Sequence, residues 1–441
     1  MTAYAAWTLF ALLAVAALRW PWIGVSAYMT YVTLGPDSHY GYLFPSALST
    51  QRILGGAVFA GLLLNASPRF PLAPPAKWAA RSLTAFMLVA SASALDSLFP
   101  DKSWWFWDHF WKIWLVVLLA VRLLDTPAKV MATIWMIVLA QAYNALLVNR
   151  EYFSLGYSVT REAGRHFLDN NTYGLSTLPP MALAAALAIY CRPVWQRALA
   201  GAILALQVHQ MLLLDSRGGM TSMIGMFLIG FLLMPKRVDT LAGSAIVLVL
   251  GLSLAGPHVV QRFESIFAKE EKLDESAMSR YDLWAAGWQI MNDYPVLGAG
   301  VFAGERLVPK YTRFKEDKEK ALHNLALDIG SGTGYLGLAC YLAFFGFGWA
   351  CAMKLVFLDQ APPAWAGAAG LGVAAGLPAY WFGSTFSSSA LIEAPYFAVA
   401  LAACAYSIAR HRRDWQGMVI MEESTPVGPA DPSQPLERWS W

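Results

Sequence analysis

The segment from residue 334 to residue 357 decides the fold class, because it is long and almost entirely apolar. It reads GYLGLACYLAFFGFGWACAMKLVF, and its single charged side chain is that of Lys354. A helix needs about 20 mostly apolar residues to cross the hydrocarbon core of a bilayer. The sequence therefore predicts a membrane-spanning helix at this position.

Similar apolar runs recur along the chain and predict an all-α polytopic membrane protein, since a helix satisfies its backbone hydrogen bonds within one segment. The runs cover residues 4–18, 22–35, 52–65, 79–97, 104–124, 128–148, 171–191, 197–214, 218–234, 240–256, 334–357, 364–382 and 389–409. The first two runs are short and form either one broken crossing or two. We expect one, which gives about twelve transmembrane helices, whereas two crossings would give about thirteen.

The composition excludes several classes of protein. Hydrophobic residues make up 57% of the 441 residues and charged residues only 14%, against about 25% charged in typical soluble domains. A soluble enzyme and a disordered protein are therefore excluded. The net charge of +3 is small and the basic residues are scattered, so no nucleic-acid partner is expected.

The four cysteines lack metal-ligand spacing, which predicts no structural metal. The expected partners are membrane lipids and lipid-linked molecules.

Lysines and arginines in short loops indicate which loops face the cytoplasm. From residue 66 onward they fall on every second loop, and the segments that share the opposite face are 36–51, 98–103, 149–170, 215–217, 257–333 and 383–388. In a Gram-negative cell that opposite face is the periplasm. We therefore expect a multi-pass protein of the bacterial inner (plasma) membrane.

The apolar runs and the loops between them divide the chain into four expected parts. They are the N-terminal transmembrane helices (residues 1–256), a large periplasmic cap (257–322), the C-terminal transmembrane helices (323–413) and a mobile cytoplasmic tail (414–441). The tail is rich in Pro, Glu and Ser, a composition that favours disorder.

The cap is the one long polar segment between membrane runs, with ten Lys or Arg and eleven Asp or Glu. Ser279 and Asp282 predict a capping box, in which the serine begins a helix. Trp284, Trp288 and Met291 then recur at helical spacing. We therefore expect a folded, helical cap.

Arg217 lies in the sequence Asp215-Ser216-Arg217-Gly218-Gly219, which joins two apolar runs with almost no loop. Charged groups near membrane depth usually have a functional partner, and the first N–H groups of the next helix favour anions. An arginine at a helix N-terminus suits a phosphate. The alternative is that Arg217 pairs with Asp215 or extends to the interface.

Arg280 repeats this arrangement, because it directly follows the expected Ser279 cap. Two such sites could hold a diphosphate, since the planar guanidinium binds phosphate oxygens with two hydrogen bonds and stays charged. The alternative for Arg280 is a solvated surface charge.

His323 lies where the cap returns to the membrane, just before Gly330-Ser331-Gly332-Thr333-Gly334. An unperturbed histidine has a pKa of about 6.5, which suits a general base near neutral pH. The alternative is an interfacial histidine that only forms structural hydrogen bonds.

A further polar segment precedes the run 171–191 and contains Arg165, Asp169, Asn170 and Asn171. Its amides and carboxylate suit sugar or acceptor hydroxyl groups, and they equally suit a helix cap. No paired carboxylates of the D-x-D kind occur in an expected outer loop, which argues against a divalent metal.

Four motifs together resemble those of the O-antigen ligase and O-antigen polymerase superfamily. They are Ser216–Gly219, Ser279–Trp284, Pro295–Gly300, and His323–Asn324 with Gly334–Gly337. The resemblance covers roughly residues 160–350. Asp169-Asn170-Asn171 also resembles the branch of exosortase-associated O-glycosylation ligases, and Pro21–Gly24 adds mild support.

The resemblance implies a type-C glycosyltransferase-like fold and transfer of a glycan from undecaprenyl diphosphate to an acceptor, without metal or cofactor. It implies that His323 is the catalytic base and that Arg217 and Arg280 bind the diphosphate. Many members have Glu where this chain has Ser331. Whether a carboxylate from elsewhere, such as Asp328, orients His323 therefore stays open.

The acceptor distinguishes three activities within this superfamily. A ligase uses a lipid A core sugar, a polymerase uses another lipid-linked chain, and a protein O-oligosaccharyltransferase uses a side-chain hydroxyl. We expect the ligase, because of the single dominant outer cap and the resemblance to the O-glycosylation ligase branch. A transporter of lipid-linked sugars is the alternative from another class, and internal repeats typical of transporters are not evident.

Overall fold

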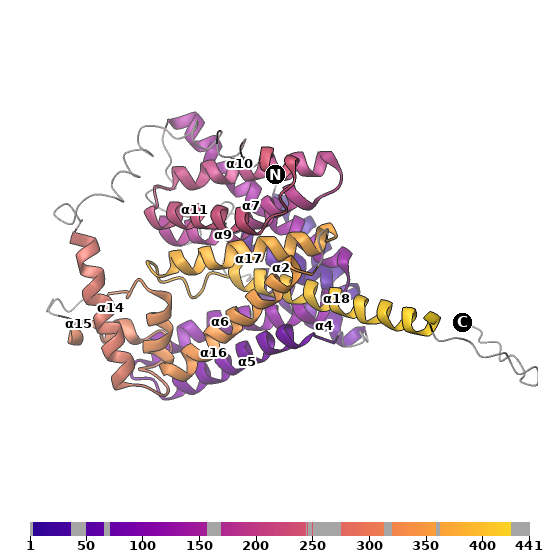
Figure 1. The fold of residues 1–441 in the computed structure, drawn as a ribbon. Coiled ribbons are helices and arrows are strands. Elements are labelled where there is room, and N and C mark those ends of the chain that lie inside the picture. Colours follow the sequence, from indigo (N-terminus) through magenta and orange to yellow (C-terminus); the bar gives the residue numbers. More distant parts are fainter. Residues whose placement is uncertain are drawn as a thin grey trace, which may run out of the picture.

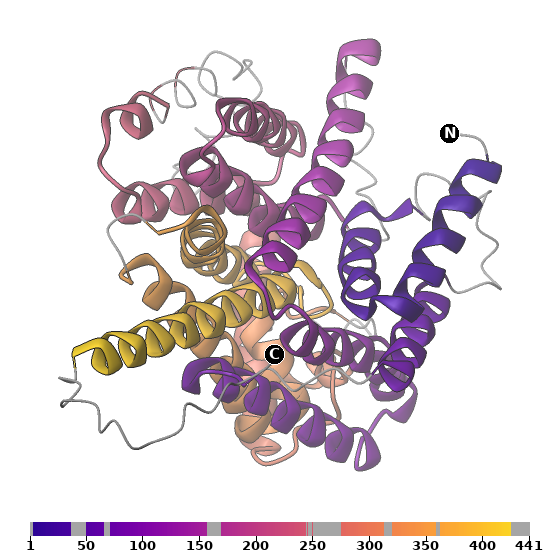
Figure 2. The same cartoon turned by 90° about the vertical axis from the view of Figure 1, so that its right-hand side faces the viewer.

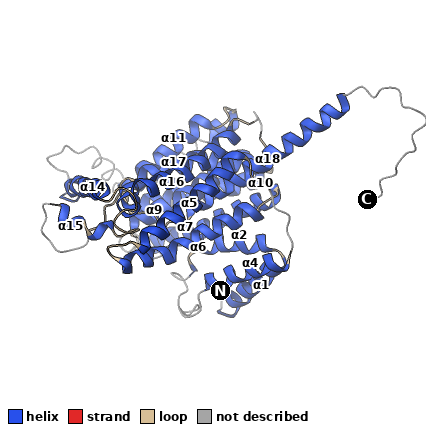
Figure 3. Ribbon diagram, turned by 90° about the horizontal axis from the view of Figure 1, so that it is seen from below, coloured by secondary structure: helices blue, strands red, loops and turns tan. Residues whose placement is uncertain are grey.

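The computed structural model describes residues 3–36, 50–65, 71–156, 169–243, 275–312, 320–358 and 362–424, together with residues 245 and 249. Within these ranges the chain is helical and contains no strand (Figure 3). The all-helical fold predicted from the apolar runs is therefore confirmed for the described residues.

The helices follow most of the predicted runs, and the run 240–256 lies largely outside the described residues. Their bounds are α1 (Ala3–Arg19), α2 (Pro21–Leu34), α4 (Thr50–Leu64), α5 (Pro74–Leu95), α6 (Pro100–Leu123), α7 (Pro127–Leu155), α9 (Asn170–Tyr190), α10 (Val194–Leu213), α11 (Arg217–Leu233), α14 (Glu275–Asp293), η3 (Gly304–Arg306), α15 (Val308–Tyr311), α16 (Leu325–Val356), α17 (Ala364–Ser384) and α18 (Ala394–Ser424). Helix α18 continues past Arg413 into the segment that we expected to be a mobile tail.

Four of the described helices are long and apolar enough to cross a membrane, namely α5, α7, α9 and α16. Helices α4 and α11 are apolar but shorter. These helices are typical of a membrane protein. The count of about twelve crossings stays a prediction.

The chain begins with two helices separated at Trp20, which leaves the helical conformation between α1 and α2. A Cβ atom added at Gly24 would lie 2.6 Å from the Cβ atom of Ala17. The helix is thus broken at Trp20-Pro21, and whether these two helices make one crossing or two stays a prediction.

Helices α9 and α17 form the centre of the bundle, and small residues let their backbones approach closely. A Cβ atom added at Gly376 of α17 would lie 2.8 Å from the Cβ atom of Ala182 in α9. Helices α1 and α4 lie on one side of the bundle and α11 lies on the opposite side (Figures 2 and 3).

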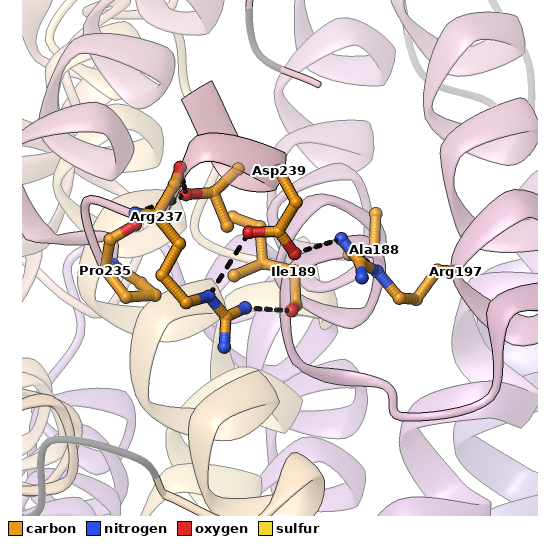
Figure 4. Close-up of polar contacts among 7 residues, drawn as sticks. Ala188, Ile189, Arg197, Pro235, Arg237 and Asp239 are labelled. Carbon is orange, nitrogen blue, oxygen red and sulfur yellow. Dashed lines mark hydrogen bonds and ion pairs between the residues drawn. The ribbon is translucent and has the colours of Figure 1, made fainter. Parts of the chain in front are cut away.

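One end of α9 is held by arginines (Figure 4). Arg197 donates to the carbonyl of Ala188 at 3.1 Å, and Arg237 donates to that of Ile189 at 3.0 Å. Asp239 joins the two, since its carboxylate lies 2.8 Å from Arg197 and 3.4 Å from Arg237. Cations at the last turn of a helix complement its dipole. The C-terminal end of α9 is therefore the basic end of this part of the bundle.

Helices α14 and α15 lie at one end of the bundle, and the last part of α18 extends from the opposite end (Figure 1). These two helices with η3 are the described helices of the predicted cap, and the cap itself stays a prediction. Helix α14 begins at Glu275, before Ser279. The prediction that Ser279 caps this helix is wrong, because nothing in Glu275–Met278 breaks a helix and a serine can lie within one.

Two glycine-rich segments dock the cap onto α16. The Ala299 amide donates to the Ser331 carbonyl at 2.9 Å, and the Tyr335 amide donates to that of Pro295 at 2.8 Å. Gly334 has φ 68 and ψ −174 and breaks the helical geometry inside α16. Helix α16 starts at Leu325, and the part of it from Gly334 onward corresponds to the apolar run predicted from residue 334.

Candidate functional site

Three helix N-termini are capped by polar side chains that the sequence had singled out. Asp169 accepts from the amides of Asn171 and Thr172 at 2.8 and 3.0 Å. Ser216 accepts from the Gly219 amide at 3.1 Å, and Asn324 accepts from the Leu327 amide at 3.1 Å. These residues begin α9, α11 and α16, each as the expected type of N-cap residue.

Side chains tie the first two of these N-termini together. The Ser216 hydroxyl donates to the side-chain oxygen of Asn171 at 2.8 Å. Asn170 donates to the carbonyl of Leu214 at 3.1 Å. The N-termini of α9 and α11 therefore lie next to each other.

The loop after α17 joins α9 and α16 to the same group. Thr172 and Ser387 share a hydrogen bond of 3.0 Å, and Asn324 donates to the Thr385 carbonyl at 3.3 Å. The N-termini of α9 and α16 thus each contact residues 385–388, and the N-terminus of α11 lies beside that of α9. The dipole of a helix favours an anion near its N-terminus. The arrangement is suited to a phosphate or diphosphate.

Arg217 is the first residue of α11 and is half-buried. Its side chain therefore extends from the N-terminus of α11, one of these three helix ends. Arg280 lies in the second turn of α14 and is also half-buried. The prediction that Arg280 itself stands at a helix N-terminus is wrong, because α14 begins five residues earlier, at Glu275.

His323 has φ 50, a left-handed backbone conformation that histidine adopts more readily than most residues. The residue lies at the surface. Desolvation by the surrounding protein, followed by the Arg280 guanidinium, lowers the pKa of His323 below 6.5, while Asp169 and Glu305 act in the opposite direction. The imidazole is therefore mainly neutral at pH 7 and able to accept a proton.

These interactions bring several predicted residues together. Arg280 in α14 lowers the pKa of His323, and Asp169 at the start of α9 raises it. Asn171 donates its amide to Asp169 and accepts from Ser216, which caps the helix that begins with Arg217. Arg165 lies outside the described residues. Within the described ranges, no group of His, Cys, Asp and Glu is placed to hold a metal ion.

Glu305 is a site residue that the sequence reasoning missed. It lies in η3 and forms an ion pair with Lys102 at the start of α6. Its negative charge raises the pKa of His323. Its neighbour Gly304 packs so closely on Ser331 that a Cβ atom there would lie 2.2 Å from the serine Oγ. A glutamate in place of Ser331 would not fit against this cap, whereas Glu305 supplies a carboxylate from the cap itself.

Asp328 occupies a different place from the one considered for it. It is 6% exposed in the first turn of α16, and its carboxylate faces the Leu322 amide and Ser388. Within the described ranges, the carboxylates that raise the pKa of His323 are those of Asp169 and Glu305. The structure thus gives no support to Asp328 as the partner of the imidazole.

A family described as O-antigen ligase matches residues 200–342, about a third of the chain. The matched segment runs from α10 through α11 and the cap into α16, and therefore includes Arg217, Arg280 and His323. No curated protein matches the chain.

Proposed function

On the premise that residues 200–342 place the chain in the O-antigen ligase superfamily, we propose that it is a metal-independent inverting glycosyltransferase. It moves a glycan from undecaprenyl diphosphate to a lipid A core sugar at the periplasmic side of the inner membrane. The observation that carries the proposal is the grouping of three helix N-termini with Arg280 and a mainly neutral histidine inside or beside the matched segment.

The donor is held through its diphosphate. Arg217 and Arg280 bind phosphate oxygens, and the dipoles of α11 and α16 favour the negative charge near their N-termini. The same groups stabilise the negative charge of the diphosphate as it leaves. This arrangement supplies the charge neutralisation that a divalent metal would otherwise provide, and no metal or cofactor is proposed.

The acceptor hydroxyl attacks the anomeric carbon of the first sugar. The bond from that carbon to the diphosphate oxygen breaks, and His323 takes the hydroxyl proton as general base. A single displacement of this kind inverts the anomeric configuration. Asp169, Asn170 and Asn171 offer hydrogen bonds to sugar or acceptor hydroxyls, and Arg165 is proposed with them from its place in the sequence.

The test is transfer by the purified protein in lipid nanodiscs. Undecaprenyl-diphosphate glycan is offered with lipid A core, with a second donor lipid or with a hydroxyl-bearing peptide, and products are identified by mass spectrometry. We expect a product with lipid A core that still forms in EDTA. A product only with the second lipid or the peptide would instead establish a polymerase or a protein O-oligosaccharyltransferase.

The same assay distinguishes the remaining alternative. Movement of the donor across liposomes that contain no acceptor, together with no transfer to any acceptor, would replace the glycosyltransferase by a transporter of lipid-linked sugars.

A further inference from the structure

The apolar part of α16 presents one exposed stripe of side chains. Tyr335, Leu342 and Trp349 are each at least 40% exposed, and their spacing of seven residues places them on one face of a helix. Helix α16 is long and apolar enough to cross a membrane. Trp349 donates its indole N–H to the carbonyl of Ala374 at 3.2 Å, so this donor is satisfied within the protein, as lipid requires. In a bilayer the stripe therefore faces lipid, and Tyr335 is at its outer end.

Two exposed side chains of the cap continue this stripe. Trp288 in α14 is 54% exposed, and Val296, just after that helix, is 64% exposed. The Trp288 and Tyr335 rings lie edge to face, with their centroids 6.3 Å apart. The Tyr335 amide donates to the carbonyl of Pro295 at 2.8 Å, which holds Val296 beside the same turn of α16. We call Trp288, Val296 and Tyr335 the outer rim.

Helix α14 has the placement and the pattern of a helix that lies in a membrane interface. It runs across the end of the bundle rather than along it (Figure 1). With 3.6 residues per turn, Gln289 lies about 100° around the helix from Trp288, and Asp282 and Asp293 lie near that same edge. All three are exposed. One exposed edge of α14 therefore carries Trp288 and the neighbouring edge is polar, as in helices that lie on a bilayer.

The chemistry of the outer rim fits the boundary between lipid and water. Tyrosine and tryptophan concentrate at this boundary because each combines an apolar ring with a polar tip. The Tyr335 hydroxyl donates to the side-chain oxygen of Asn292 at 2.6 Å, on the cap side, while its ring continues the stripe that faces lipid. A sugar also stacks on exposed aromatic rings, but a sugar site in water would not continue into a lipid-facing stripe.

We propose that the outer rim lies in the leaflet on the cap side of the membrane, so that the cap is held on the lipid surface as well as on α16. This contact depends neither on the acceptor nor on the chemistry of the site, and it therefore goes beyond the proposed function. Arg280 lies two turns before Trp288 on α14. The lipid contact thus keeps the Arg280 guanidinium near the level of the lipid phosphates.

The test is the depth of spin labels on the full chain in lipid nanodiscs. In a background without the four native cysteines, Trp288→Cys, Val296→Cys and Gln289→Cys each receive one nitroxide. Electron paramagnetic resonance measures how often each label collides with oxygen, which concentrates in lipid, and with a water-soluble nickel chelate. The ratio of oxygen to nickel collisions should be several-fold higher at residues 288 and 296 than at residue 289.

Two features of this set make the comparison sharp. Gln289→Cys is the matched control, because it is exposed on the same helix directly beside Trp288, and Leu342→Cys gives the value of a lipid-facing position in α16. Val296→Cys keeps the Trp288 ring in place, so it remains informative even where loss of that ring loosens α14.

The other outcomes overturn the proposal in different ways. Equally low ratios at residues 288, 289 and 296 would show that the outer rim lies in water. Few collisions with either reagent at residues 288 and 296 would show that protein covers the rim, as in an association of two copies of the chain. Neither result alters transfer from the lipid-linked donor, so the proposed function is decided by its own assay.

Discussion

At the scale of single residues, the backbone of His323 sets how its role is best tested. Its φ of 50 suits asparagine as well as histidine, so His323→Asn removes the base without adding backbone strain. General-base catalysis contributes about 10²- to 10⁴-fold, and turnover of His323→Asn should fall by that order. Donor binding should persist, because on the proposed mechanism Arg217 and Arg280, not His323, bind the diphosphate. Near-normal turnover in a purified donor–acceptor assay would show that another group is the base.

The charges around His323 predict the pH dependence of transfer. On the proposed mechanism the neutral imidazole is the active form, so activity should be lost as the pH falls through the pKa of His323, which lies below 6.5. Glu305→Gln removes a carboxylate that raises this pKa, so the acidic limb should move to lower pH. The measurement is kcat/KM between pH 4.5 and 8. A limb that moves upward, or that persists in His323→Asn, would contradict this assignment.

The two arginines should be sensitive to replacement by lysine, which keeps the charge but loses the two-pronged hydrogen bond. Arg217→Lys and Arg280→Lys should each raise the KM for the donor by about tenfold or more. Arg52→Lys is the control, since this exposed arginine lies 3.8 Å from Asp108 on the surface and should behave as wild type. The same change in KM for all three variants would remove the case for a diphosphate clamp.

At the scale of elements, the junction between the cap and α16 depends on a glycine. Gly334 has a backbone conformation that is essentially restricted to glycine, and a Cβ atom there would lie 2.5 Å from the backbone of Val296. Gly334→Ala should therefore destabilise the protein by about 1–3 kcal/mol and lower its thermal unfolding temperature in detergent.

Gly346 provides a control within the same helix. A Cβ atom added there meets nothing within 4 Å, and alanine favours a helix over glycine by about 1 kcal/mol. Gly346→Ala should leave the unfolding temperature unchanged or raise it. Equal destabilisation by both substitutions would mean that loss of any glycine from α16, rather than this junction, is responsible.

The elements also show which features the sequence could predict. Apolar runs locate the helices because burial in lipid or protein requires them, and Asp169, Ser216 and Asn324 were recognisable beside those runs. The start of α14 was not, because a capping-box pattern also fits residues inside a helix. Glu305 was missed because a charge in a long polar loop has no periodicity, and its place depends on the docking of Gly304 onto Ser331.

At the scale of the whole molecule, the candidate site and the arginine cluster lie at opposite ends of α9. This helix has 21 residues, a length of about 30 Å at 1.5 Å per residue, which matches the hydrocarbon thickness of a bilayer. Asp169 is at its first end, while Arg197 and Arg237 hold its last carbonyls. If basic residues mark the cytoplasmic side, the site must face the periplasm.

This orientation predicts which positions react with a membrane-impermeant maleimide. Tyr281 in α14 and Trp195 beside Arg197 are each 66% exposed, so a cysteine at either position is accessible to the reagent. In a background without the four native cysteines, Tyr281→Cys should be labelled in cells whose outer membrane has been permeabilised. Trp195→Cys should be labelled only after the inner membrane is disrupted, because the reagent cannot cross it. Labelling of Trp195→Cys but not of Tyr281→Cys while the inner membrane is intact would show the opposite topology. The site would then face the cytoplasm, and transfer at the periplasmic side would be excluded.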